Sequence, residues 1–230
     1  MRLRTAFAAS LGIGSAALLF TLRHRITDRV VELAASRPGG WIGRRLYTEP
    51  AAHQASFDAT LEALALTPED RLLELGCGGG SLLDRALAVG CSAKAIDHSP
   101  DMIALCGRRN QAAIDAGNLE LAVGDAGRLP YPDGGFTAVA STNAFFFFAD
   151  PAAVLREAHR VLATGGRLAI FTSAPDAPAR HAPRPFAQRM YRYPDDELRQ
   201  MLTDAGFTNV TVLRKGMEGS GQLATAERPD

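Results

Sequence analysis

The sequence predicts an α/β fold in which a mostly parallel β-sheet is covered on both faces by helices. From residue 71 onward, short apolar runs alternate with longer amphipathic segments. Such alternation is typical of strands joined by crossover helices, which bury a parallel sheet on both faces. The longer segments also carry the sequence signals of helix starts. The chain has 230 residues, enough for one domain with a full core.

Seven apolar runs are the predicted strands, and the last of them is expected to be antiparallel. Only the segment "KGMEGSG" (215–221) separates the sixth run from the seventh. A parallel crossover needs a dozen or more residues, so these two strands must run in opposite directions. The predicted strands are 71–75, 93–97, 119–123, 136–141, 166–172, 209–213 and 222–226.

The helices between these strands are predicted from caps and from apolar spacing. Ser81 with Asp84 resembles a capping box, and Ser99–Pro100 and Asp150–Pro151 each place a capping residue before a proline at the first helical position. Gly206 follows the stripe at 198–205 and ends that helix. Helices are also expected over 151–162 and within 26–67, where Phe57, Leu61 and Leu64 share one face.

Composition excludes several classes of protein. Apolar residues make up 47% of the chain, charged residues 22%, and the net charge is zero. A neutral chain lacks the basic surface that nucleic-acid backbones attract, so no nucleic-acid partner is expected. Cys77, Cys91 and Cys106 show no C-x-x-C spacing, which argues against a disulfide framework or a metal site and favours a cytoplasmic protein.

The first 25 residues differ from the rest of the chain. Eighteen uncharged residues, 5–22, lie between basic residues, and as a helix they would reach about 27 Å, enough to cross a bilayer core. Only seven of them are Leu, Ile or Phe. The sequence leaves open a membrane anchor or peripheral helix, a cleaved signal, a helix docked on the domain, and a start codon placed too early. We therefore divide the chain into an apolar segment (1–25), a helical cap (26–69) and a main domain (70–230).

The stretch "ELGCGGGS" (74–81) has the glycines of a nucleotide-binding turn between a strand and a helix. No lysine follows the glycines, which excludes a P-loop, and the small third residue of the dinucleotide fingerprint is replaced by Ser81 or Leu83. The pattern acidic-x-G-x-G-x-G does fit Glu74, Gly76, Gly78 and Gly80. A tight turn without a ligand is the alternative.

Acidic residues end the next two predicted strands. Asp97 lies 21 residues after Gly76, where a carboxylate can accept hydrogen bonds from both hydroxyls of a ribose. A helix cap is the alternative role for Asp97, but Ser99 fills it better. Asp125 follows the third strand and can contact an adenine edge. Because strand ends converge at one edge of such a sheet, three carboxylates there disfavour a pyrophosphate and favour a positively charged nucleotide.

Four segments carry a resemblance to a known family. "LLELGCGGGSLL" (72–83), "AIDHSPDMI" (95–103), "GDAGRLPYPDGGF" (124–136) and "REAHRVLATGGRLAI" (156–170) resemble motifs of class I S-adenosylmethionine-dependent methyltransferases, of the small-molecule type with a single methyltransferase domain. The resemblance covers about residues 70–171 and, more weakly, 201–213. It implies a Rossmann-like, doubly wound, seven-stranded sheet with an antiparallel last strand. It also implies S-adenosylmethionine as cofactor and methyl transfer to a small-molecule acceptor.

The resemblance also implies roles for individual residues. The methionine end of the cofactor would lie against Glu74 and the loop, the ribose against Asp97, and the adenine against the third strand end, while residues after the fourth strand would lie beside the methyl group. The cofactor-binding residues implied are Glu74, Gly76, Cys77, Gly78, Gly80, Asp97, His98, Met102, Asp125, Ala126, Thr142 and Asn143. Two positions depart from the family pattern: Thr137 stands where Asp is usual, and Ala163–Thr164 where Lys–Pro is usual.

The acceptor side is less clear from the sequence. His53, His98, His181, Tyr191 and Tyr193 could each act as a base, but no spacing singles one out, so the catalytic residue is unknown. The phenylalanines 145–148 either line an acceptor pocket or pack beneath the following helix. The arginine-rich segment 174–192 is either a solvated loop or a site for an anionic acceptor.

Two other functions compete with methyl transfer. One is a nicotinamide-dependent oxidoreductase, which the missing third small residue disfavours. The other is a methyltransferase-like module that binds the cofactor without turnover. Nucleic-acid and protein substrates are disfavoured because "STNA" (141–144) replaces N/D-P-P-Y after the fourth strand. We expect a cytoplasmic location, with membrane association through residues 5–22 left open.

Overall fold

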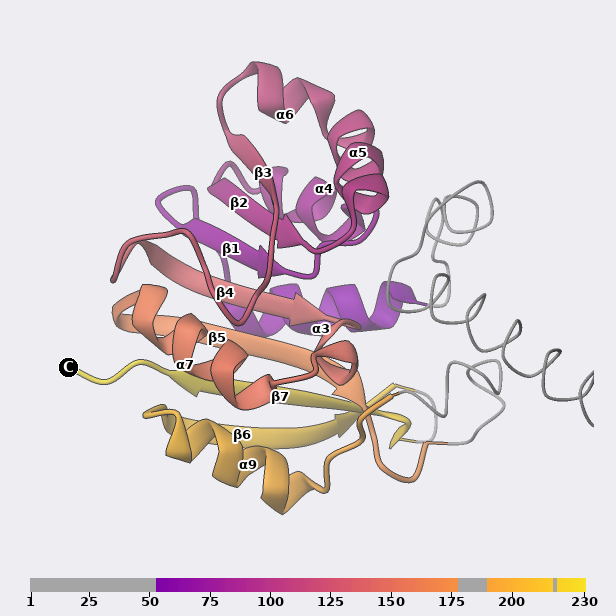
Figure 1. Cartoon of the computed structure of the whole chain (residues 1–230), viewed down its shortest axis with the longest axis vertical. Coiled ribbons are helices and arrows are strands. Elements are labelled where there is room, and N and C mark those ends of the chain that lie inside the picture. Colours follow the sequence, from indigo (N-terminus) through magenta and orange to yellow (C-terminus); the bar gives the residue numbers. More distant parts are fainter. Residues whose placement is uncertain (1–52, 178–189, 217–218) are drawn as a thin grey trace, which may run out of the picture.

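The computed structural model describes residues 53–177, 190–216 and 219–230, and these form a seven-stranded sheet with helices on both faces (Figure 1). The predicted fold class is confirmed. The elements in chain order are α3 (Gln54–Leu64), β1 (Arg71–Leu75), α4 (Ser81–Leu87), β2 (Ser92–Asp97), α5 (Pro100–Arg109), α6 (Gln111–Asp115), β3 (Leu119–Val123), β4 (Phe136–Thr142), η2 (Phe145–Phe147), α7 (Pro151–Val161), β5 (Leu162–Ser173), α9 (Asp195–Asp204), β6 (Thr208–Lys215) and β7 (Gly221–Glu227).

The strand order across the sheet is β3-β2-β1-β4-β5-β7-β6. β1 pairs in parallel with β2 and β4, and the parallel pairing continues from β2 to β3 and from β4 to β5. β7 inserts between β5 and β6 and is antiparallel to both. The prediction of an antiparallel last strand is therefore confirmed. The order reverses between β1 and β4, which is the kind of position where ligands bind in open α/β sheets.

The observed strands match the predicted runs closely. β1 and β3 have the predicted bounds, while β5 begins at Leu162 rather than at Gly166. The early start arises because Leu162 pairs with Phe136 before the register between β4 and β5 shifts. The pairing resumes at Arg167 opposite Ala138.

The two faces of the sheet contribute to separate hydrophobic clusters, as expected when side chains alternate along a strand. Leu72 of β1 packs in a cluster that includes Phe57 of α3 and Leu83 of α4. Its neighbour Leu73 packs in the cluster that includes Leu155 of α7 and residues of α9. Figure 1 shows α3 and α7 on opposite sides of the sheet.

Two predicted helix caps are confirmed and one is wrong. The Ser99 hydroxyl accepts from the Met102 amide at 3.4 Å, and the Asp150 carboxylate accepts from the Ala153 amide at 2.9 Å. The capping box at Ser81 does not form. α4 begins at Ser81, so Gly80 occupies the capping position with φ of 76°, and the Ser81 hydroxyl has no partner within the described residues.

The predicted N-terminal regions are only partly described. Residues 1–52, which include the apolar segment 5–22, lie outside the described residues. From the helical cap, α3 is described, and it packs with Phe57 and Leu64 buried. Over the described ranges, no helix is long and apolar enough to cross a membrane. The division at residues 25 and 69, and membrane association through 5–22, stay predictions.

Thr137, which departs from the family pattern, belongs to a polar network at the amino edge of the sheet. Its hydroxyl donates to Asp70 Oδ1 at 2.6 Å and accepts from the Arg71 amide at 2.9 Å. Asp70 Oδ2 accepts from Arg167 Nη2 at 2.8 Å and from the Thr67 amide, also at 2.8 Å. A second carboxylate at position 137 would face Asp70, so threonine suits this neighbourhood better than aspartate.

Stability at acid pH should depend on Asp70. Burial alone would raise the pKa of this carboxyl, but hydrogen bonds from Thr137, the Thr67 amide and Arg167 outweigh burial and lower the pKa. A lowered folded-state pKa means that the stabilisation is present above the unfolded-state pKa and is lost as pH falls through the folded-state value. Asp70→Asn should cost about 1–3 kcal/mol of unfolding free energy at pH 7. It should also reduce the fall in unfolding free energy that the wild type shows below about pH 5.

Urea unfolding at several pH values measures this effect. Asp115→Asn is the matched control, because Asp115 is exposed and, among the residues that the structure describes, its side chain bonds only to Gln111 in its own helix. If the unfolding free energy falls as much at acid pH in Asp70→Asn as in the wild type, the role given to Asp70 is contradicted.

Candidate functional site

The carboxyl ends of β1, β2 and β4 meet at one edge of the sheet, and the glycine loop, residues 76–80, starts there. The Gly76 amide donates to the Ile96 carbonyl of β2 at 2.8 Å. The Ser141 hydroxyl of β4 donates to the Leu75 carbonyl at 3.1 Å. The loop therefore leaves the sheet between two strand ends that hold it in place.

The glycines of this loop are required by backbone conformation and by space. Gly76, Gly78 and Gly80 have φ values of 75°, 51° and 76°, a region that side chains disfavour. A Cβ at Gly76 would lie 2.5 Å from Ala144 Cβ, and a Cβ at Gly80 would lie 2.5 Å from Cys106 Sγ. The loop thus packs against the tip of β4 on one side and against α5 on the other.

The C-terminal part of α5 holds the second half of the loop. Asn110 Nδ2 donates to the Gly80 carbonyl at 3.2 Å, and Arg109 Nε donates to the Gly79 carbonyl at 2.9 Å. Cys106 is fully buried on the same helix and contacts Cys77 of the loop. These α5 residues were not predicted from the sequence, because nothing in the motif indicates which helix packs on the loop.

Asp97 connects the end of β2 to the glycine loop. Its Oδ2 accepts from the Gly78 amide at 3.0 Å, and its Oδ1 accepts from the Ser99 amide at 2.9 Å. The side chain is 7% exposed, and His98 Nδ1 lies 3.4 Å from Oδ1. An ionised carboxylate offers about four lone-pair sites, so Asp97 can shape the loop and still accept from a ligand.

Glu74 is the most unusual side chain of the site. It is 2% exposed at the end of β1, and its Oε2 has no hydrogen-bond partner within the described part of the chain. Burial, with further contributions from Cys106 and Asp97, raises the pKa of the Glu74 carboxyl well above its ordinary value. An unpaired buried acid is costly unless a ligand supplies the missing partner.

The tip of β4 is tied to α3 by two side-chain hydrogen bonds. Asn143 Nδ2 donates to Ser56 Oγ at 2.6 Å, and the Thr142 hydroxyl donates to Thr60 Oγ1 at 3.0 Å. Asn143 has φ of 58°, a conformation that asparagine tolerates better than most residues. Ser56 and Thr60 were not predicted, since no sequence signal places α3 beside β4.

The structure shows the packing role for Phe145, while the predicted acceptor-pocket role stays a prediction. Phe145 is fully buried in the cluster with α7, which is the packing alternative. Phe148 is partly exposed, and its ring edge would lie 3.7 Å from a Cβ at Gly76. Phe146 and Phe147 stack edge to face with centroids 4.5 Å apart. At least Phe148 therefore borders the loop rather than serving the core alone.

Asp125, Ala126 and Met102, the remaining predicted residues, are related to the glycine loop less directly. Asp125 is exposed just after β3, where its Oδ1 accepts from the Gly127 amide at 2.8 Å, and Ala126 is buried. The third strand end adjoins the second, because the Gly124 amide donates to the Asp97 carbonyl at 3.0 Å. Met102 is fully buried, so a contact with adenosine is not evident from its exposure.

No residue stands out as a catalytic base within the described ranges. His53 precedes α3, and burial lowers the pKa of its imidazole, which keeps the ring neutral at pH 7. Burial, with the nearby Glu197 and Tyr191, raises the pKa of Tyr193 to about 12. Tyr191 is 54% exposed. His181 and residues 178–189 of the arginine-rich segment lie outside the described residues.

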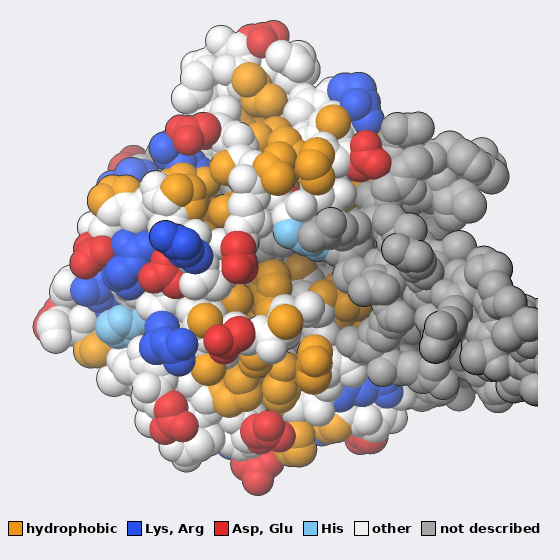
Figure 2. Space-filling view, viewed as in Figure 1, with side chains coloured by type: hydrophobic (Ala, Val, Ile, Leu, Met, Phe, Trp, Pro, Cys, Tyr) orange, Lys and Arg blue, Asp and Glu red, His pale blue; other side chains and the backbone are white. Residues whose placement is uncertain are grey.

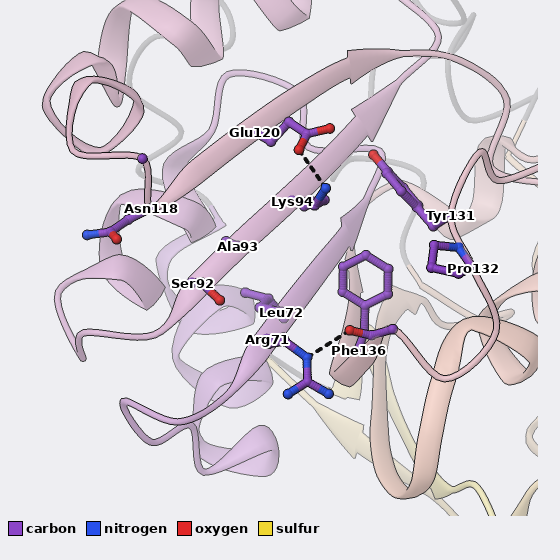
Figure 3. A pocket seen from close by; sticks show the side chains of 12 residues that line it. Arg71, Leu72, Ser92, Ala93, Lys94, Asn118, Glu120, Tyr131, Pro132 and Phe136 are labelled. Atoms are coloured by element: carbon purple, nitrogen blue, oxygen red, sulfur yellow. Dashed lines mark hydrogen bonds and ion pairs between the residues drawn. The ribbon is translucent and has the colours of Figure 1, made fainter.

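A separate cavity of about 220 Å³ lies at the opposite, amino edge of the sheet (Figure 3). It is lined by the first residues of β1, β2 and β4, among them Arg71, Ser92 and Phe136. Its Lys94 is already paired, with Nζ 2.5 Å from Glu120 Oε2. The β3–β4 connection contains no helix that would cover this part of the sheet. The cavity is therefore a gap in the covering layer, on the edge away from Glu74 and Asp97.

Charged side chains of both signs are interspersed on the face shown in Figure 2. In this view the Lys and Arg side chains lie next to Asp and Glu side chains. The described residues of this face thus form no continuous basic surface of the kind that binds nucleic acid.

Residues 73–170 of the chain match a family model described as a methyltransferase domain. A demethylmenaquinone methyltransferase from Thermus thermophilus is 38% identical over 116 residues, which cover 49% of this chain and 51% of the relative. An arsenite methyltransferase from Halobacterium salinarum is 31% identical over 166 residues, which cover 66% of this chain and 40% of the relative. The chain spans about half the length of the curated relatives it matches.

A solved structure shows the same fold. The crystal structure of a SAM-dependent methyltransferase from Aquifex aeolicus superposes with a TM-score of 0.67 at 20% identity, covering 80% of this chain and 96% of that chain. At this identity the likeness establishes the fold, and it agrees with the doubly wound sheet and its antiparallel β7.

The close packing of the loop can be tested with two glycines of equal φ. Gly80 and Gly117 both have φ of 76°, but a Cβ at Gly117 would meet nothing within 4 Å, whereas one at Gly80 would overlap Cys106 and Asn110. Gly117→Ala should cost about 1–2 kcal/mol of unfolding free energy from backbone strain alone. Gly80→Ala should cost at least about 1–3 kcal/mol more, because overpacking adds to that strain. Equal losses in urea unfolding would show that α5 does not pack on the loop.

Proposed function

We propose that the chain is a class I S-adenosylmethionine-dependent methyltransferase that transfers a methyl group to a small-molecule acceptor by in-line displacement. The observation that carries this proposal is the unpaired Glu74 Oε2, buried where the ends of β1, β2 and β4 meet. It lies beside Asp97 and a glycine loop that leaves main chain, rather than side chains, at the edge of the sheet.

The residues of this edge fit S-adenosylmethionine. The cofactor carries no phosphate and bears a sulfonium and an ammonium group, both positive. Glu74 and Asp97 offer acidic oxygens to such a ligand, whereas the pyrophosphate of a dinucleotide brings negative charge and no hydrogen-bond donors for them. The orphaned Glu74 oxygen is a buried acceptor that lacks a donor, and an ammonium group supplies donors.

We assign the predicted residues to parts of the cofactor. Glu74 and the loop, which includes Cys77, face the methionine end, and Asp97 with His98 faces the ribose. Asp125 and Ala126 face the adenine, with Met102 in the wall behind the adenosine. Thr142 and Asn143 face the sulfonium and the adjoining amino-acid part. Support for this order comes from adjacency in the sheet: β1 lies between β2 and β4, and β3 lies beyond β2.

Alignment and exclusion of water are the contributions expected from this chain. When bound, S-adenosylmethionine supplies an electrophilic methyl group and a thioether leaving group. The chain holds the donor by the loop and positions the acceptor beyond the tip of β4, which converts a bimolecular step into an oriented one. Phe148 borders that region and can attract a sulfonium through its ring face by about 0.5–2 kcal/mol.

The acceptor class stays a proposal at the level of a small molecule. The relatives named above are a demethylmenaquinone and an arsenite methyltransferase, so their acceptors differ widely in chemistry. Without an assigned base, acceptors that need no deprotonation before attack are favoured.

The two competing functions are separated by one set of measurements. Calorimetric titration with S-adenosylhomocysteine and with NADH distinguishes a methyltransferase site from a nicotinamide site. Incubation with methyl-labelled S-adenosylmethionine and a small-molecule extract then distinguishes an enzyme from a module without turnover. Labelled extract products support the proposed function. Binding of NADH in place of S-adenosylhomocysteine, or the absence of labelled product, would contradict it.

Asp97 should contribute strongly to cofactor affinity. Asp97→Ala removes the acceptor of the ribose hydroxyls and of the Gly78 amide, so S-adenosylhomocysteine should bind more weakly by about 2–3 kcal/mol, or roughly 30–150-fold. Calorimetry measures the affinity. Asp204→Ala, on α9, is the control and should leave it unchanged, because within the described ranges that side chain bonds only to Gln200. Unchanged affinity in Asp97→Ala would exclude the ribose assignment.

Cofactor binding should release a proton from Glu74. The pKa of this carboxyl is raised in the free protein, and a nearby ammonium favours the ionised form, so binding lowers the pKa. The proton released is measured by calorimetry of S-adenosylhomocysteine binding in buffers with different ionisation enthalpies. Glu74→Gln should abolish the buffer dependence. A wild-type binding enthalpy that is identical in all buffers would argue against contact between Glu74 and the ammonium group.

A further inference from the structure

We propose that Ser56 of α3 is a positioning residue that turns the side-chain carbonyl of Asn143 toward the ammonium group of the bound cofactor. This inference rests on the proposed function and deepens it. It extends the cofactor site to a helix that lies before residues 73–170, the part that matches the methyltransferase domain model.

The direction of the hydrogen bonds orients the Asn143 amide. Ser56 Oγ donates its only proton to the His53 carbonyl at 2.7 Å. Toward Asn143 it can therefore only accept, and it accepts from Nδ2 at 2.6 Å. Since Nδ2 points at α3, the carbonyl Oδ1 points away from that contact.

A second series of hydrogen bonds, between hydroxyl groups, ties the neighbouring residue Thr142 to α3 as well. Thr142 Oγ1 donates to Thr60 Oγ1 at 3.0 Å, and Thr60 Oγ1 donates to the Ser56 carbonyl at 2.8 Å. Ser56, Thr60 and Thr142 are 5%, 0% and 6% exposed, so water does not compete for these bonds. Two series of hydrogen bonds, one through Ser56 and one through Thr60, thus hold the β4 tip against the backbone of α3.

The β4 tip borders the half of the loop assigned to the methionine end. Ala144 follows Asn143, and its Cβ would lie 2.5 Å from a Cβ at Gly76, the first glycine. Asp97 holds Gly78, further along the loop. Asn143 is therefore next to the start of the loop, on the β4 side of Glu74.

The Asn143 carbonyl has the chemistry that an ammonium group needs. No hydrogen bond to Oδ1 occurs within the described part of the chain, and Asn143 is partly exposed, so a ligand can reach it. An ammonium group donates three hydrogen bonds, and Glu74 Oε2 can accept only some of them. Without Ser56, the amide loses the acceptor that keeps Nδ2 turned toward α3.

The test is a double-mutant cycle read out with two ligands on the full chain. S-adenosylhomocysteine carries the amino-acid part, whereas 5′-methylthioadenosine lacks it and probes the adenosine part alone. Asn143→Gly removes the side chain and suits a φ of 58°. Ser56→Ala removes the acceptor for Nδ2. Calorimetry gives the affinity of each variant, and their combination, for both ligands.

We expect Asn143→Gly and Ser56→Ala each to weaken S-adenosylhomocysteine binding about 5–10-fold, since about one hydrogen bond is lost. Binding of 5′-methylthioadenosine should change less than about twofold, which also shows that the variants are folded. In the Asn143→Gly background, Ser56→Ala should have no further effect. Ser92→Ala, at the opposite edge of the sheet, is the matched serine control.

Three outcomes would overturn the inference while leaving the proposed function intact. These are unchanged S-adenosylhomocysteine affinity in Ser56→Ala, equal weakening for both ligands, and a Ser56→Ala effect that persists without the Asn143 side chain. Ser56 is buried, so Asn143→Gly serves as the second variant if Ser56→Ala does not fold. The affinity lost in Asn143→Gly must then be specific to S-adenosylhomocysteine. Failure of the wild-type chain to bind S-adenosylhomocysteine would instead overturn the proposed function, and this inference with it.

Discussion

Close approach of the glycine-loop backbone to the side chains of Ala144 and Cys106 is the constraint on which the rest of the site depends. A Cβ at Gly76 would overlap Ala144, and one at Gly80 would overlap Cys106. Because Gly76 and Gly80 let the loop pack closely on both sides, the ends of β1, β2 and β4 come close enough for Glu74, Asp97 and Asn143 to share one edge. A wider loop would separate these groups and leave Asp97 without its bond to the Gly78 amide.

The same constraint explains the electrostatics of the site. Glu74 is buried near Cys106 of α5 and Asp97, and burial is the largest cause of its raised pKa. Asp97 is also buried, but it accepts two backbone amides. Two carboxyls in one region therefore have different surroundings: one is held by backbone donors, and the other lacks a partner for one oxygen. Such a pair suits a ligand that brings its own positive charge, and the cost of burying Glu74 is offset only when that ligand is bound.

Much of the fold could be predicted from the sequence, because the spacing of apolar residues and the length of loops depend on local interactions. The bounds of β1 and β3 follow from apolar runs, and the antiparallel β7 follows from a connection too short for a crossover. Ser81 shows where this fails. Its position before a helix suggested a cap, but the loop requires Gly80 in a left-handed conformation at the capping position, so Ser81 becomes the first helical residue. A tertiary requirement overrode a local preference.

The candidate site was predicted only in part, for a related reason. Glu74, the glycines and Asp97 are close in sequence to strand ends, and the convergence of parallel strands brings them together whatever else the chain does. Asn110, Ser56 and Thr60 reach the site from helices whose packing no motif specifies.

The network around Thr137 shows how a departure from a family pattern can be structural rather than functional. Asp70 already supplies a carboxylate at the amino edge, with Arg167 as its counter-charge, so a hydroxyl that both donates and accepts completes the arrangement. That network lies at the edge of the sheet away from Glu74. Threonine at position 137 can therefore stabilise the sheet without altering the site, because the network and the site lie at opposite edges. At one edge the Asp70 carboxylate accepts from Thr137, Arg167 and the Thr67 amide, whereas at the other Glu74 keeps an acceptor unpaired for a ligand.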